Sequence, residues 1–196
     1  MSGAQRVLNV GGATKKIPLP APYSGWRHDL LDIDPAGGAE IVCDARNMLE
    51  LPAASYDAVY CSHNLEHYYR HDLPGVLAGF LHVLKPAGFA DVRVPDMLAV
   101  FEAVTRKGMD IDDVLYDSPA GAVTVNDVIY GLGRQIAASG VDFYAHKNGF
   151  TPRSLARALR GAGFAELFVT SGPYEVAALA FRQAPTPEQR ALFRLP

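Results

Sequence analysis

The chain has 196 residues, of which 49% are hydrophobic and 20% are charged, and its net charge is −3. This size and composition predict one globular domain with a substantial core. The slightly acidic pI of about 6.0 argues against partners such as nucleic acid or an anionic membrane. No apolar run suggests a signal peptide or a bilayer span, and Cys43 and Cys61 lie in strand-like runs rather than in a disulfide framework. We therefore expect a cytoplasmic protein.

The first predicted strand, residues 6–10, runs directly into Gly11 and Gly12. A short apolar run rich in β-branched residues is typical of a buried parallel strand. Glycine lacks a Cβ atom, so the backbone can turn sharply and a small molecule can lie against the main chain. Ligands of open α/β sheets bind at the carboxyl ends of strands. This glycine turn is therefore a candidate ligand site, although a plain turn is the alternative interpretation.

The next segment, residues 13–24, contains three prolines, which exclude a full crossover helix. The second strand is predicted at 28–33 and the third at 40–44. Parallel neighbours usually need a connection of a dozen or more residues, and this connection is shorter. The third strand is therefore either very short or part of a trimmed sheet edge.

A fourth strand is predicted at 56–62, followed by a helix over 73–84 with Asp72 as its N-cap. Residues 85–88 are expected to end this helix and turn into a fifth strand at 89–94. Asp91 and Arg93 are unusual in a strand that is covered on both faces. They indicate that one face of the sheet is thinly covered, and such a face could form a homodimer interface.

Residues 97–149 are expected to be helical in parts and to form a substrate-side or lid insertion within the single domain 1–196. A helix should then begin at Thr151, and two strands at 164–170 and 174–181 should form a hairpin. The tail from Pro185 is expected to be loosely held. The resulting fold class is α/β, a doubly wound, Rossmann-like and mostly parallel sheet with an antiparallel strand at its end and reduced early crossover helices.

Acidic residues follow the second and third strands at Asp32 and Asp44. A carboxylate after the second strand can accept both hydroxyls of a ribose, and one strand further on it could accept from the amine of adenine. The spacing G-x-G-x-x-G of dinucleotide sites is absent, and the prolines leave no helix to receive a pyrophosphate. The pattern favours S-adenosylmethionine, although each acid alone could merely cap a turn.

Several segments together resemble the class I S-adenosylmethionine-dependent methyltransferases, and most closely the compact bacterial, methyltransferase type 11-like branch. They are residues 8–12 (LNVGG), 31–33 (LDI), 43–46 (CDAR), 51–52 (LP), 56–67 (YDAVYCSHNLEH), 83–88 (VLKPAG) and 94–96 (VPD), with 150–164 resembling the later helix and turn.

This resemblance implies a seven-stranded sheet whose last strand is antiparallel. It also implies S-adenosylmethionine as the cofactor. The implied cofactor contacts are Gly11 and Gly12 at the methionine end, Asp32 at the ribose, Asp44 and Ala45 at the adenine, and Ser62 and His63 on the cleft floor. Val10 and Ile33, beside the glycine turn and Asp32, are further candidate cofactor contacts. The family's glycine loop usually carries a further glycine, whereas this chain has Ala13 and Thr14.

The segment His63-Asn64-Leu65-Glu66-His67 matches the H-x-x-E-H pattern of zinc peptidases. Such a site needs both histidines on one helix face, and His63 lies at a strand end. We therefore expect no metal, and expect Glu66 and His67 to hold the loop by hydrogen bonds. His63 and His146 are the candidate catalytic residues, His146 as a general base, although methyl transfer can proceed by alignment of the reacting atoms alone.

The sequence therefore predicts an enzyme that transfers a methyl group from S-adenosylmethionine to a small molecule. Two alternatives remain open. One is a non-catalytic binding or partner module that kept the fold, which Ala13 and the trimmed helices favour. The other is a zinc hydrolase that acts through His63 and His67.

Overall fold

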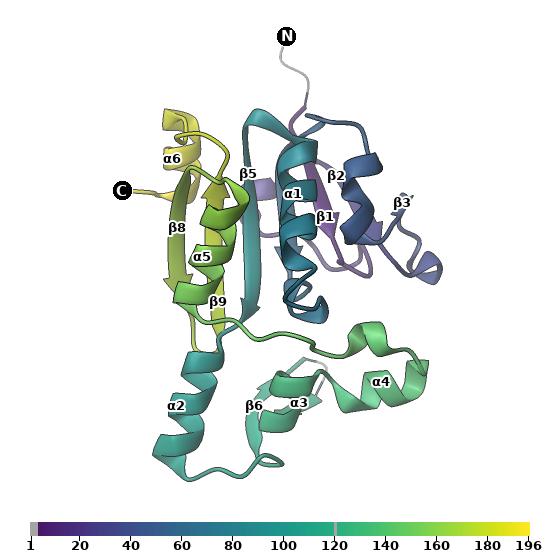
Figure 1. The fold of residues 1–196 in the computed structure, drawn as a ribbon, viewed down its shortest axis with the longest axis vertical. Coiled ribbons are helices and arrows are strands. Elements are labelled where there is room, and N and C mark those ends of the chain that lie inside the picture. Colours follow the sequence, from purple (N-terminus) through teal and green to yellow (C-terminus); the bar gives the residue numbers. More distant parts are fainter. Residues whose placement is uncertain (1–3, 120) are drawn as a thin grey trace.

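A computed structural model describes residues 4–119 and 121–196 and shows a mixed α/β fold built on one large sheet (Figure 1). The sheet has seven strands in the order β3-β2-β1-β4-β5-β9-β8. The first five strands run parallel, and β9 runs antiparallel to both of its neighbours, as predicted. The strands are β1 (Arg6–Val10), β2 (Arg27–Asp32), β3 (Ile41–Val42), β4 (Tyr56–Ser62), β5 (Leu84–Pro95), β8 (Glu166–Ser171) and β9 (Glu175–Phe181).

Short 3-10 turns replace crossover helices between the first four strands. They are η1 (Ala21–Tyr23), η2 (Pro35–Gly37) and η3 (Ala45–Glu50). Because proline removes backbone donors, the segment between β1 and β2 cannot continue as a helix. The third strand has only two residues, so the expectation of a very short strand is confirmed.

One face of the sheet is covered by two helices, α1 (Leu73–Val83) and α5 (Pro152–Ala162), which pack over the main core. Thr151 starts α5 with a capping box, in which its hydroxyl accepts from Ser154 N and the Ser154 hydroxyl accepts from Thr151 N. Asp72 is the N-cap residue of α1, as predicted, although its side chain makes no capping hydrogen bond. The helix ends before residue 85, as predicted, but β5 already begins at Leu84, which pairs with Tyr56. The expected turn at 85–88 is a bulge within β5, between the pairs that Leu84 and Phe89 make with β4.

The opposite face is covered by the proline-rich segment before β2 and by a C-terminal helix, α6 (Pro187–Phe193). Aromatic side chains fill this layer: the rings of Phe89 and Phe193 lie 5.0 Å apart, and Tyr23 lies 6.3 Å from Phe193. The expectations of a loosely held tail and a thinly covered face are therefore wrong. The apolar face on which the homodimer prediction rested is covered within the chain itself.

Asp91 and Arg93, the polar residues of β5, belong to this covered layer. Asp91 is 3% exposed, accepts from the Tyr23 hydroxyl at 3.1 Å and lies 3.4 Å from Arg93 Nε. Burial raises the pKa of Asp91 despite the guanidinium of Arg93 beside it. The two charges therefore mark a buried polar contact with the proline-rich segment rather than an open face.

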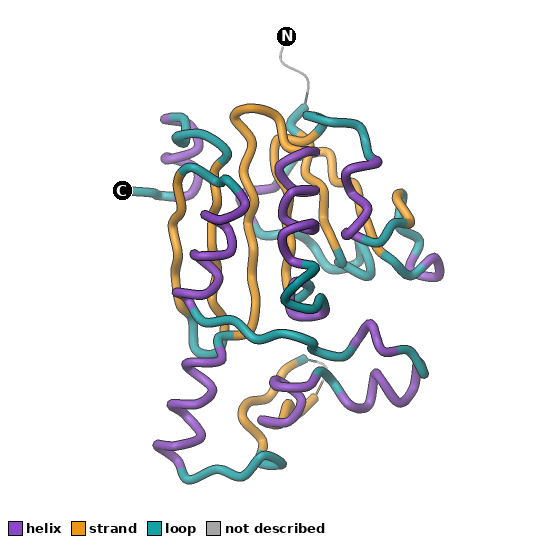
Figure 2. Tube along the Cα trace, in the orientation of Figure 1, coloured by secondary structure: helices purple, strands orange, loops and turns teal. Residues whose placement is uncertain are grey.

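A second lobe follows β5 and lies beyond the carboxyl ends of the parallel strands (Figures 1 and 2). It has its own hydrophobic cluster, which includes Met97, Val100, Leu115 and Val128. The β-hairpin in this lobe was not predicted, since its short strands lie between helices. The elements of the lobe are α2 (Met97–Lys107), β6 (Val114–Ser118), β7 (Gly121–Thr124), α3 (Val125–Tyr130), α4 (Gly133–Ser139) and η5 (Asp142–Tyr144). None of the helices in the described part of the chain has the length and apolar character needed to cross a membrane.

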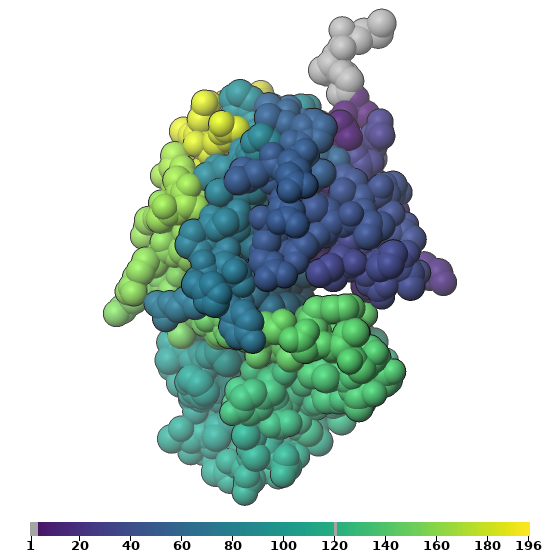
Figure 3. Space-filling view, turned by 45° about the vertical axis from the view of Figure 1, so that its right-hand side comes forward, coloured from purple at the N-terminus to yellow at the C-terminus, as the bar shows by residue number. Residues whose placement is uncertain are grey.

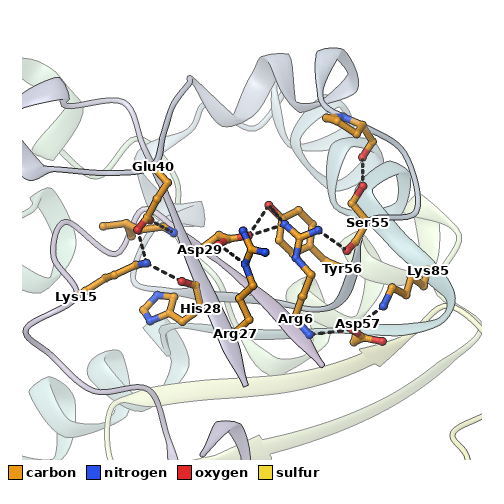
Figure 4. Close-up of polar contacts among 12 residues, drawn as sticks. Arg6, Lys15, Arg27, His28, Asp29, Glu40, Ser55, Tyr56, Asp57 and Lys85 are labelled. Atoms are coloured by element: carbon orange, nitrogen blue, oxygen red, sulfur yellow. Dashed lines mark hydrogen bonds and ion pairs between the residues drawn. The ribbon is translucent and has the colours of Figure 1, made fainter. Parts of the chain in front are cut away.

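A polar network joins the amino-terminal ends of the parallel strands, opposite the second lobe (Figure 4). Arg6 donates to Asp29 Oδ2 at 2.7 Å, and the Tyr56 hydroxyl lies 3.2 Å from the same oxygen. The backbone N–H of Arg6 and the ammonium of Lys85 both donate to Asp57 at 2.8 Å. These contacts link the beginnings of β1, β2, β4 and β5 at the end of the sheet away from the second lobe.

Replacement of Asp29 by asparagine is expected to lower the free energy of unfolding at pH 7 by about 1.5–3 kcal/mol, the usual loss for a hydrogen bond to a charged group. Burial would raise the pKa of Asp29, but the hydrogen bonds from Arg6 and Tyr56 outweigh it, so the pKa lies below its ordinary value. The unfolded chain then binds the proton first as the pH falls, and the stabilisation is lost below about pH 4. Urea unfolding at pH 7 and pH 3 should show a difference that shrinks in acid. The exposed Asp117→Asn variant should show no such difference, and a constant difference for Asp29→Asn would contradict this account.

Candidate functional site

A cleft of about 430 Å³ lies between the carboxyl ends of the strands and the second lobe. Figure 3 shows the green surface of residues near 130–149 directly below the blue surface of the N-terminal strands and turns. The size is within the range of small-molecule sites. The lining residues from the sheet side include Gly11, Ala13, Asp32, Ile33, Asp34, Asp44, Arg46, His63, Asn64, Glu66, His67 and Tyr68, and those from the lobe include Tyr116, Val123, Asp127, Val128, Leu132, Phe143, Tyr144, His146 and Lys147.

The glycine turn after β1 is shaped by two asparagine side chains. Gly11 has a φ of +73°, and a Cβ atom there would lie 2.1 Å from the side chain of Asn64. A Cβ atom at Gly12 would lie 2.2 Å from the side chain of Asn9. Gly11 therefore requires glycine, by its positive φ and by its packing, whereas a side chain at Gly12 would have to displace the amide of Asn9. Gly11 lines the cleft, whereas Gly12 and the buried Val10 do not.

Ala13 completes this turn in a left-handed conformation, with a φ of +52°. Its backbone N–H donates to Asp32 Oδ2 at 3.0 Å, which ties the turn to the end of β2. A residue with a Cβ atom is strained in this region of backbone space, by roughly 1–2 kcal/mol. Ala13 therefore occupies a left-handed backbone conformation that normally favours glycine.

Replacement of Ala13 by glycine is expected to raise the free energy of unfolding by about 0.5–1 kcal/mol, because relief of strain exceeds the added freedom of the unfolded chain. Urea unfolding would measure the difference. Ala36→Gly, at an exposed alanine in the η2 turn of the same region, is the matched control and should be neutral or destabilising. A loss of stability in Ala13→Gly would show that the positive φ is not strained.

Asp32 ends β2 with a carboxylate that faces the cleft and is 8% exposed. Its Oδ2 accepts from Ala13 N, and its Oδ1 accepts from Asp34 N at 2.9 Å. Each carboxylate oxygen has two acceptor sites, so one site on each oxygen is left for a ligand. Ile33 follows with a side chain that is 42% exposed and lines the cleft, which gives the carboxylate an apolar neighbour.

Asp44 starts the η3 turn and also lines the cleft, but its carboxylate is already engaged. Oδ1 accepts from Arg46 N at 2.9 Å, and Oδ2 lies 2.6 Å from the guanidinium of Arg46. Burial would raise the pKa of Asp44, and the contacts with Arg46 lower it below its ordinary value. Ala45 is 1% exposed and packs in the main core, outside the cleft lining. Of the two acids, Asp32 is the more available acceptor.

His63 follows β4 with a φ of +51° and a half-exposed side chain. Its Nε2 lies 3.0 Å from Glu175 Oε2 and its Nδ1 lies 3.5 Å from Glu66 Oε1. Burial would lower the pKa of His63, but the two glutamates outweigh it and raise the pKa to about 10. A general base must be neutral at the working pH. His63 is instead a cation at neutral pH, and the preceding Ser62 is absent from the cleft lining.

Glu66, His67 and His146 meet at the boundary between the two lobes. Their candidate ligating atoms all lie within 4.8 Å of one another, and the two imidazole rings are 4.9 Å apart, edge to face. Burial lowers the pKa of His67, with a further decrease from the neighbouring His146. The zinc-peptidase pairing of His63 with His67 is wrong, because His63 turns to Glu175 and lies outside this cluster.

Sequence reasoning missed three residues that shape the site. Glu175 is the first residue of β9, 112 positions from His63, so no local pattern connects them. Arg46 lies only two positions after Asp44, and this spacing could have indicated the ion pair. Asn64 packs against Gly11, and its place directly after β4 was the available signal.

Comparison with known proteins gives one family match: residues 29–90 match the model of the family described as "Methyltransferase domain". A search of curated proteins finds no match. Several solved structures share the fold. A SAM-dependent methyltransferase from Archaeoglobus fulgidus has a TM-score of 0.58 at 17% identity, covering 91% of this chain and 86% of its own. A second, from Mesorhizobium loti, has a TM-score of 0.58 at 17% identity with 92% of both chains covered, and a third, from Methanosarcina mazei, has 0.54 at 15% with the same coverage.

Residues 29–90 thus match a methyltransferase domain, and the fold of the chain is that of the SAM-dependent methyltransferases of known structure. The matched segment, residues 29–90, runs from β2 into β5 and therefore contains Asp32, Asp44 and the loop from His63 to His67. The glycine turn and the second lobe lie outside it. The second lobe, which forms the far wall of the cleft, therefore has no counterpart in the matched segment.

The cleft fits S-adenosylmethionine, the cofactor of the structurally similar methyltransferases. Gly11 lacks a side chain on the cleft wall, Asp32 keeps acceptor sites for hydroxyl groups, and Ile33 offers an apolar surface beside it. These are the features that a ribose and an adenine require next to a strand end. When bound, this cofactor supplies an electrophilic methyl group on a sulfonium.

Proposed function

We propose that this methyltransferase transfers a methyl group to a small-molecule acceptor bound on the second-lobe side of the cleft. The observation that carries the proposal is the continuity of the cleft, which runs from Gly11 and Asp32 to Val128 and Phe143 of the second lobe. A cofactor at the strand ends and an acceptor against the lobe would then share one cavity. In this proposal residues 97–149 act as the substrate-side insertion.

We assign the ribose hydroxyls to Asp32 and the adenine to the apolar side chain of Ile33. The methionine end would lie against the main chain at Gly11, with Val10 and Gly12 shaping the turn behind it. Asp44 and Ala45 remain predicted neighbours of the adenine. Asp44 would accept a hydrogen bond from the adenine amine while its carboxylate stays paired with the guanidinium of Arg46. Ser62 and His63 remain predicted at the cleft floor.

The reaction needs the acceptor atom, the methyl carbon and the sulfur to lie in line, and such alignment supplies much of the rate enhancement. Tyr116, Phe143 and Tyr144 line the acceptor side and give it aromatic walls. His63 is paired with Glu175 and does not take a proton in this proposal. His146 remains the catalytic candidate on the acceptor side.

Isothermal titration of the purified chain with S-adenosylmethionine and with S-adenosylhomocysteine tests the cofactor site. Binding of one molecule per chain is expected. Formation of S-adenosylhomocysteine during incubation with panels of hydroxylated and amine-bearing aromatic metabolites tests turnover. Absence of binding for both compounds would overturn the proposal.

A non-catalytic binding module is the second candidate. The ion pair between Asp44 and Arg46, together with the strained Ala13, supports it, because both reduce what the cleft offers a cofactor. The same titrations distinguish the two. A module that only binds would take up S-adenosylhomocysteine but form none from S-adenosylmethionine with any acceptor.

A further inference from the structure

Glu66 is a buried carboxylate whose side chain has no hydrogen-bond partner. The residue is 1% exposed, and both Oε1 and Oε2 lie within the protein without a donor at hydrogen-bond distance. The nearest cation, His63, is 3.5 Å from Oε1, and the other ring nitrogen of His63 is held by Glu175. Burial of a carboxylate in this state is costly unless a charged partner joins it. The expected hydrogen bonds of Glu66 and His67 to the loop are made by the Glu66 backbone carbonyl and by Nδ1 of His67, and not by the Glu66 carboxylate.

The loop is instead held by the backbone of Glu66. Its carbonyl accepts from Lys147 N at 2.8 Å and from Asn148 N at 3.1 Å. These bonds fix the segment that carries His146 against the η4 turn (Leu65–His67). The side chain of Glu66 makes no hydrogen bond to hold the loop; it lies beside two imidazoles, with His63 at 3.5 Å.

Both imidazoles are oriented by backbone carbonyls. Nδ1 of His67 lies 3.2 Å from the carbonyl of Ala145, and Nδ1 of His146 lies 2.9 Å from the carbonyl of Val128. A ring that donates from Nδ1 keeps the lone pair of Nε2 for a metal ion, and such outer contacts are typical of metal-ligating histidines. Two oriented imidazoles and one carboxylate without a hydrogen bond form a recognised ligand set for zinc.

We propose that Glu66, His67 and His146 bind a divalent transition-metal ion, with Zn²⁺ the best match to the ligand set. This proposal departs from the expectation, based on sequence, that the chain binds no metal. All three residues line the cleft, so a coordination position left by three protein ligands would open toward the acceptor.

The role of this metal rests on the proposed methyl transfer. A metal ion bound to an acceptor hydroxyl lowers the pKa of that hydroxyl, so the proton leaves to solvent. The oxygen then attacks the methyl carbon, a C–O bond forms, and the C–S bond breaks with its electron pair remaining on sulfur. The products are the methyl ether and S-adenosylhomocysteine. The inferred acceptor class is a small molecule with a hydroxyl group able to bind a metal.

Metal binding by the full-length chain tests the site directly. Protein stripped with a chelator and dialysed should bind one Zn²⁺ per chain in competition with a chromophoric chelator, and Co²⁺ should give visible absorption bands. Glu66→Gln and His146→Ala should each weaken Zn²⁺ binding by about 100-fold or more, since each removes one of three ligands. His71→Ala is the matched control, because His71 lies in the same region but is 80% exposed and outside the cluster, and it should bind as the wild type does.

Circular dichroism would show whether each variant is folded, and His67→Gln replaces any variant that is not. Zn²⁺ binding that is equal in the wild type and in the folded variants would overturn the metal site. Titration of the metal-free chain with S-adenosylhomocysteine keeps the two proposals separate. Cofactor binding without Zn²⁺ binding would refute the metal site alone, and Zn²⁺ binding without cofactor binding would refute the methyl-transfer function alone.

Discussion

Replacement of Asp32 by asparagine is expected to weaken the binding of S-adenosylhomocysteine by about 10- to 100-fold, the loss of one or two hydrogen bonds to a charged group. The carboxylate already accepts from Ala13 N and Asp34 N and keeps two acceptor sites for the ribose. An amide group in its place would turn an NH₂ toward a backbone N–H or toward the ligand. Isothermal titration at a temperature where both proteins are folded measures the effect.

Asp112→Asn serves as the control, since this exposed carboxylate lies outside the cleft lining and changes the net charge equally. It should leave the affinity unchanged. An affinity of Asp32→Asn within twofold of the wild type would mean that the ribose is not held by Asp32, and the adenosine position proposed for the cleft would fail with it.

Replacement of Phe89 by alanine is expected to lower the free energy of unfolding by about 3–5 kcal/mol, the range for a large aromatic residue in a core. Phe89 is 1% exposed, and its ring contacts those of Phe181 at 5.3 Å, Phe193 at 5.0 Å and Trp26 at 6.3 Å. It therefore joins the sheet to both segments that cover this face. Urea unfolding followed by circular dichroism measures the loss.

Phe101→Ala on α2 provides the comparison, because this ring is 54% exposed and its removal should cost less than about 0.5 kcal/mol. A loss below about 1 kcal/mol for Phe89→Ala would indicate that the C-terminal helix and the proline-rich segment do not close the face. The short helix α6 would then contribute little to the stability of the core.

Much of the sheet could be predicted because its signals are local. Apolar runs that end in Gly11, Asp32 and Asp44 fix where parallel strands stop, and prolines between β1 and β2 prevent a crossover helix. Asp91 and Arg93 misled the prediction, because a charged residue in a strand normally indicates solvent. The hydroxyl of Tyr23, 68 residues earlier in the chain, satisfies Asp91 instead.

The sequence by itself determined the α/β fold, the glycine turn and the acid after the second strand, since each depends on neighbouring residues and on backbone chemistry. Only the tertiary structure decided how the side chains are partnered. It paired His63 with Glu175, occupied Asp44 with Arg46, and brought His146 to Glu66 and His67 from 79 residues away. The physical reason is that burial and hydrogen bonding determine the charge and availability of a side chain, and both depend on segments that meet only when the chain folds.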